Sequence, residues 1–71
     1  MYVYKLADDN CKYGEYSGFV IVAKNQESAR MIAMDRAGKS QWIAFANCPI
    51  DCIGTATEWE ERIILESTLG E

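Results

Sequence analysis

One of the two longest uninterrupted apolar segments of the chain, residues 19–23, has the sequence Phe-Val-Ile-Val-Ala. β-Branched residues dominate it and no polar residue alternates with them, which is typical of a strand buried on both faces. We therefore expect this strand to be central in a sheet. The segment is far shorter than the roughly 20 apolar residues that a membrane-crossing helix needs, so we expect no membrane span.

The length of the chain limits the number of domains and the size of the core. A chain of 71 residues is short for more than one domain, so we expect a single domain over residues 1–71. Such a chain buries only about 60% of the surface that its unfolded form exposes, which leaves little apolar material to line a deep pocket. Any function should therefore lie on the surface of one small core.

Three further segments have the pattern of strands. Residues 1–6 alternate in polarity with the period of two that a strand requires, and residues 8–18 collect the glycine, serine, asparagine and aspartate typical of a loop. Pro49 introduces a strand over residues 50–57, and a polar corner separates it from a last strand over residues 62–67. We expect these last two strands to form a hairpin.

A helix is predicted over residues 26–37. Asn25 is a favourable N-cap and Gly38 supplies a C-terminal stop. Three alanines on the apolar face let the helix approach the sheet closely. The residues of that face are Ala29, Ile32, Ala33 and Ala37. Residues 40–47 hold apolar side chains at helical spacing and indicate a single helical turn or an irregular arm.

The order of these elements predicts the α+β class. A ββαββ chain suits a four-stranded antiparallel or mixed sheet with one main helix on one face. The buried residues are expected to come from the inward positions of the strands and helix. They are Phe19, Ile21, Ile32, Ala33, Ile53, Ile63 and Leu65.

The three cysteines, Cys11, Cys48 and Cys52, cannot all pair within the chain. Because the N-terminus also has no secretory signal, we expect reduced thiols and a cytoplasmic location. Zinc needs four nitrogen or sulfur ligands, and the chain has no histidine to complete a set, so we expect no metal and no cofactor. Free cysteine is commonly a small buried hydrophobe, which is our interpretation of Cys52 if it points inward with Ile50.

Catalytic groups are missing from the sequence. Without histidine, a cysteine nucleophile lacks its usual base, and clustered exposed carboxylates generally form a solvated corner rather than an acid/base pair. Gly14 and Gly18 stand alone and do not make a phosphate-binding loop. We therefore expect that the protein is not an enzyme.

Charge and exposed apolar residues suggest protein binding instead. The net charge of −4 disfavours contact with nucleic acid or anionic membranes, whereas an acidic face can occupy a nucleic-acid-binding groove on another protein; simple solubility is the other interpretation. Tryptophan beside acidic residues suits an interface, and methionines off the alanine stripe suit an adaptable contact surface. The predicted partner-binding residues are Glu58, Trp59, Glu60, Glu61, Met31 and Met34.

Five sequence features together carry a resemblance. They are FVIVA at residues 19–23, ESAR at 27–30, a central Trp42, CIGTA at 52–56 and IILES at 63–67. This arrangement is similar to a group of short acidic proteins encoded by phages and prophages, in which an FVV.A strand precedes an EEAR helix and an IG.A strand precedes a final apolar strand. The likeness spans most of the chain, but residues 31–39 replace a more acidic stretch of that group.

Small acidic phage proteins of this kind resemble inhibitors of host defence, such as anti-CRISPR proteins. The resemblance implies a protein that binds a host protein or complex in the bacterial cytosol and makes no direct contact with nucleic acid. The alternative is a self-associating structural or accessory module of a phage or bacterial assembly, in which exposed methionines and an open sheet edge form a homodimer.

Overall fold

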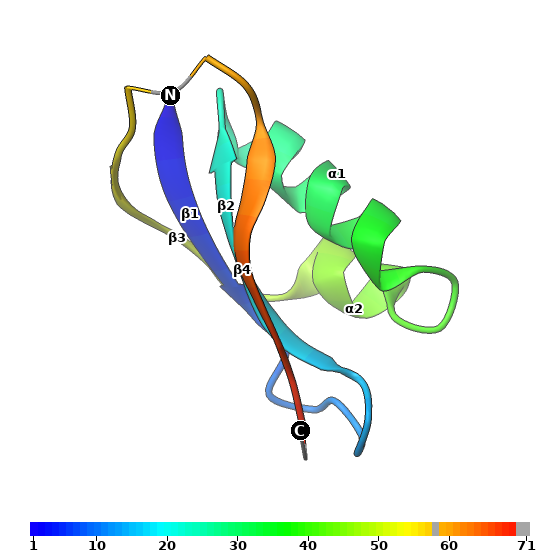
Figure 1. Cartoon of the computed structure of the whole chain (residues 1–71). Helices are drawn as coiled ribbons and strands as arrows, with labels where there is room; N and C mark the ends of the chain where they lie inside the picture. The colour runs from blue at the N-terminus through cyan, green and yellow to red at the C-terminus, as the bar shows by residue number, and fades with distance from the viewer. Residues whose placement is uncertain (58, 70–71) are drawn as a thin grey trace.

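The computed structural model describes residues 1–57 and 59–69. One four-stranded sheet is covered on one face by both helices (Figure 1). In chain order the elements are β1 (Tyr2–Ala7), β2 (Tyr16–Ala23), α1 (Gln26–Ala37), α2 (Trp42–Asn47), β3 (Ile50–Thr55) and β4 (Arg62–Thr68). The predicted α+β class is confirmed.

The strand order is β3-β1-β2-β4, and every neighbouring pair is antiparallel. The hairpin β1–β2 is central, as predicted for residues 19–23, but the hairpin predicted between the last two strands is wrong. β3 pairs with β1 and β4 pairs with β2, at opposite edges of the sheet (Figure 1). Each late strand thereby joins a central apolar strand, and the intervening residues 56–61 can span the roughly 14 Å across three strand spacings.

Strand β2 begins at Tyr16, within the segment predicted as a loop. Gly18 lies opposite Ala7 on one side and Ser67 on the other. A Cβ at Gly18 would lie 2.7 Å from the carbonyl oxygen of Leu6, so only glycine lets the strands meet here. Gly18, which the sequence pattern assigned to a loop, therefore permits the close pairing of β2 with β1.

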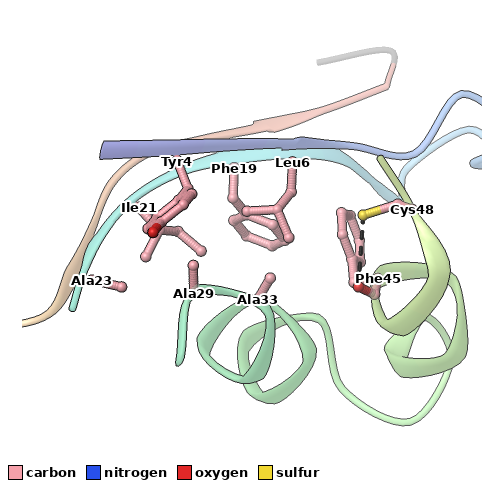
Figure 2. Packing of buried hydrophobic residues seen from close by; sticks show 9 residues of the cluster. All are labelled: Tyr4, Leu6, Phe19, Ile21, Ala23, Ala29, Ala33, Phe45 and Cys48. Carbon is pink, nitrogen blue, oxygen red and sulfur yellow. Dashed lines mark hydrogen bonds between the residues drawn. The ribbon is translucent and has the colours of Figure 1, made fainter. Parts of the chain in front are cut away.

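Helix α1 begins and ends as predicted. The Asn25 side chain accepts a hydrogen bond of 2.8 Å from the Ser28 N–H. At the other end Gly38 has a φ of 80°, and its N–H donates to the carbonyl of Met34. Ala29 and Ala33 are fully buried against the sheet (Figure 2).

The core lies between the sheet and the two helices (Figure 2). Phe45 of α2 is fully buried, and its ring meets that of Phe19 edge-on at a centroid distance of 4.9 Å. Phe19, Ile21 and Ala33 are buried as predicted, and Ile32 and Ile63 are partly buried against the cluster.

Two predicted core residues are exposed instead. Leu65 is 60% exposed because it lies opposite Val20, on the sheet face turned away from the helices. Ile53 is 56% exposed and lies at an irregularity where β3 has one residue more than β1. A bulge shifts which residues face the core, and the sequence pattern alone does not reveal that shift.

Gln41 joins the connection between the helices to the sheet. Its side chain is 4% exposed, and its amide accepts from the Tyr16 N–H at 2.9 Å and donates to the Tyr16 carbonyl at 2.8 Å. This pair of bonds imitates the pairing of a neighbouring strand. It satisfies the backbone of Tyr16 and fixes the start of α2.

We predict that Phe45→Ala lowers the free energy of unfolding by about 3 to 5 kcal/mol, because it opens a cavity beside Phe19. Ile43→Ala on the same helix, where the side chain is 61% exposed, should change it by about 0.5 kcal/mol or less. Urea denaturation measures both. Equal midpoints for the two variants would contradict the assignment of Phe45 to the core.

Gln41→Leu should cost about 2 to 4 kcal/mol, because it leaves the N–H and carbonyl of Tyr16 without their partner. Gln26→Leu, at an exposed position of α1, is the matched control and should have little effect. Thermal denaturation compares them. A Gln41→Leu variant as stable as the control would show that the two hydrogen bonds contribute nothing.

Candidate binding surfaces

The predicted acidic corner lies on the connection between β3 and β4. Trp59 is 92% exposed, and Glu60 and Glu61 are exposed beside it; Glu58 lies outside the described residues. The Glu61 carboxylate accepts a hydrogen bond of 2.9 Å from the Lys24 N–H, just after β2. We refer to residues 59–61 as the Trp59 corner.

The N-terminal end of this connection, at Ala56, is hydrogen-bonded as well. The Ala56 N–H donates to the Met1 carbonyl at 2.9 Å, and the N-terminal ammonium donates to the Ala56 carbonyl at 3.2 Å. Contacts on both sides therefore tie the segment that carries Trp59 to the ends of the central strands. The exposed indole stands on an anchored connection.

Met31 and Met34 do not share one environment. Met31 is 69% exposed, whereas Met34 is partly buried and packs against the core cluster. Both line an open groove of about 720 Å³ along α1, together with Arg30 and the first residues of the helix. Met34 therefore contributes to stability as well as to this surface.

The sheet face opposite the helices forms a further surface, which the sequence analysis did not identify. Pairing registers place on it two cross-strand rows that span all four strands. One row is Asp51, Lys5, Val20 and Leu65, and the other is Gly54, Val3, Val22 and Arg62. We refer to these eight residues as the open sheet face, because neither helix lies on it (Figure 1).

The open sheet face is apolar along its centre. Val22 is fully buried although it lies outside the helix-side cluster, while Val3 and Val20 are half-buried and Leu65 is largely exposed. A shallow hollow of about 130 Å³ lies beside Leu65, where Gly18 presents no side chain. This face thus combines a protruding side chain with a hollow next to it.

Glu66 lies on the helix-facing side of the sheet, opposite Phe19. Its carboxylate accepts hydrogen bonds of 2.8 and 3.0 Å from Arg36, whose guanidinium also lies 5.9 Å from the centre of the Tyr16 ring. The hydrogen bond and charge of Arg36 lower the pKa of Glu66. This ion pair joins α1 to the edge strand β4.

The buried thiol is that of Cys48, whereas Cys52 is exposed and Cys11 is intermediate. Arg30 donates to the carbonyls of Phe45 and Cys48 at 3.0 and 2.8 Å, which satisfies the C-terminal end of α2. Burial raises the pKa of the Cys48 thiol, so it stays protonated at neutral pH and is a poor nucleophile. All three cysteines are free.

A second open cleft, of about 620 Å³, lies between the β1–β2 loop and α2. Its carboxylates support the loop: Asp8 accepts from the Asn10 N–H at 3.0 Å, and Glu15 accepts from the Lys12 N–H at 2.8 Å. Within residues 1–57 and 59–69 no group of three or more cysteine or acidic side chains could hold a metal ion.

Comparison with protein-family models, with curated proteins and with solved structures finds no match. Neither helix in the described part of the chain is long and apolar enough to cross a membrane.

The Arg36–Glu66 pair predicts a pH dependence. Because the folded state lowers the pKa of Glu66 below its usual 4.5, the pair's contribution is complete above that pH and is lost as the pH falls through the folded pKa. The Glu66→Gln variant should therefore lose less stability on acidification than the unmodified protein, because it has no carboxylate at this position to protonate. Denaturation midpoints measured from neutral to acidic pH test it, and identical pH profiles for the variant and the unmodified protein would contradict it.

Proposed function

We propose that the protein acts by binding another protein, as an inhibitor of a host defence complex of the anti-CRISPR kind. The observation that carries the proposal is the Trp59 side chain, 92% exposed and flanked by Glu60 and Glu61. Tryptophan is highly buried on average, and it is among the residues that most often dominate the energy of an interface. An exposed indole on an anchored connection is therefore a good candidate for a contact residue.

The acidic residues suggest what the partner surface is like. With a net charge of −4, the protein is repelled by phosphate backbones and attracted to basic grooves, including those that bind nucleic acid. The proposed partner is a host protein or complex in the bacterial cytosol. Inhibition by occupying its surface needs neither a cofactor nor catalysis.

Anchoring favours the same proposal. Glu61 is bonded to the backbone of Lys24, and Ala56 is bonded to that of Met1, so both sides of the connection are fixed before a partner arrives. Binding then loses less conformational entropy than it would with a free loop. The resemblance to acidic phage proteins supplies the biological class, and the Trp59 corner supplies the contact.

The test begins with a pull-down from lysate of bacteria that carry an active defence system, followed by binding kinetics on the purified partner. Trp59→Ala should raise Kd by roughly 30-fold or more, mainly through faster dissociation, because it removes the aromatic anchor. Glu60→Gln should slow association and weaken its salt dependence. Tyr13→Ala removes an aromatic that is 82% exposed elsewhere and should change neither rate.

A partner that binds Trp59→Ala and Glu60→Gln as well as the unmodified protein would show that the contact surface is wrong. A defence system that remains fully active when the protein is expressed would overturn the inhibitor proposal itself. Circular dichroism of each variant checks that the fold is retained, so that loss of binding can be assigned to the contact.

A further inference from the structure

We propose that the open sheet face is the interface of a homodimer, in which two copies pack sheet against sheet. This inference is independent of the inhibitor proposal, because it concerns the opposite chemistry: apolar residues on strands rather than an acidic connection. It rests on the area, the charge and the shape of the face, and on the irregular backbone pairing of the two edge strands.

The area of the face approaches what a small dimer needs. Strands of six to eight residues, at about 3.3 Å per residue and 4.8 Å between strands, give a face of roughly 450 Å². That is about a tenth of the 4796 Å² of total accessible surface, the share that standard interfaces occupy. Two such faces bury about 900 Å² before protruding side chains are counted, close to the roughly 1,000 Å² expected of a specific contact.

The charge of the face permits two copies to meet. Lys5 and Asp51 lie directly opposite each other on β1 and β3, and Arg62 lies near the far end. The face therefore holds two basic residues and one acidic residue, although the chain as a whole carries −4. Face-to-face packing therefore brings together residues that are not acidic on balance, so two copies repel each other less there than the net charge of −4 alone implies.

The shape of the face favours a side chain as the occupant of its hollow. At about 130 Å³, the hollow is well below the roughly 300 Å³ of a small-molecule site. Leu65 protrudes beside it with 60% of its side chain exposed. A two-fold axis lets Leu65 of each copy enter the hollow of the other, which is the reciprocal contact that a symmetric dimer requires.

The edges of the sheet are less suitable than its face. β3 has an irregularity opposite Val3 and Tyr4, and β4 has one opposite Val20 and Ile21. Bulges twist an edge and interrupt its row of unpaired backbone groups, which is how natural sheets prevent edge-to-edge pairing. Self-association through the face is therefore favoured over extension of the sheet.

Sedimentation velocity from about 5 µM to about 500 µM, a range that brackets micromolar association, should show the monomer converting to a dimer. Leu65→Lys should raise the dimer Kd at least about 100-fold, because symmetry places two ammonium groups in one apolar contact. Leu65→Ala, which only shortens the protruding side chain, should raise it about 10-fold. Met31→Lys adds the same charge at a position on α1 that is 69% exposed and should leave Kd unchanged.

A protein that stays monomeric to the highest concentration would overturn the proposal. The open sheet face would then be a surface for a different protein. A dimer that Met31→Lys dissociates and Leu65→Lys does not would place the interface on α1 instead. Should Leu65→Lys fail to fold, Leu65→Ala decides the question, since truncating an exposed side chain costs the fold little.

Discussion

Close packing of α1 on the central strands is the contact on which the rest of the structure depends. Ala29 and Ala33 are fully buried and bring the helix against the core residues of β1 and β2. Phe45 then fills the adjacent space beside Phe19, which places α2 on the same face. Because a chain of 71 residues supplies only this one helical layer, neither helix covers the opposite sheet face, where Val22 is buried but Leu65 is largely exposed.

Periodicity and capping predicted the elements well, because they are local signals. Helix α1 was found from Asn25, Gly38 and its alanine stripe, and the class followed from the order of the elements. The pairing of the last two strands was predicted wrongly, because a hairpin between β3 and β4 and pairing of each with a central strand fit the same sequence. Two features have no local sequence signal: the irregularity at Ile53 and the burial of the Gln41 side chain against the Tyr16 backbone. Both depend on contacts between residues distant in the chain.

The candidate surfaces were predicted only in part. Trp59 and its neighbouring glutamates could be selected from the sequence, since an acidic corner with an aromatic is visible there. The open sheet face could not, because an error in register moves Leu65 from one face of the sheet to the other. The structure thus separates two regions: an acidic connection that carries the exposed Trp59, and a partly apolar sheet face that neither helix covers. A dimer would carry the Trp59 corner twice, which would strengthen binding to a partner with two sites.

The central claim is that the face left uncovered by the helices is a contact surface. Methyl NMR spectra recorded on dilution test it most directly, because each methyl group reports on its own surroundings. If the open sheet face is a contact surface, the methyl signals of Val3, Val20 and Leu65 shift with concentration, while those of Ile43 on α2 and Met31 on α1 stay constant. Shifts confined to the helical side, or none at any concentration, would contradict it.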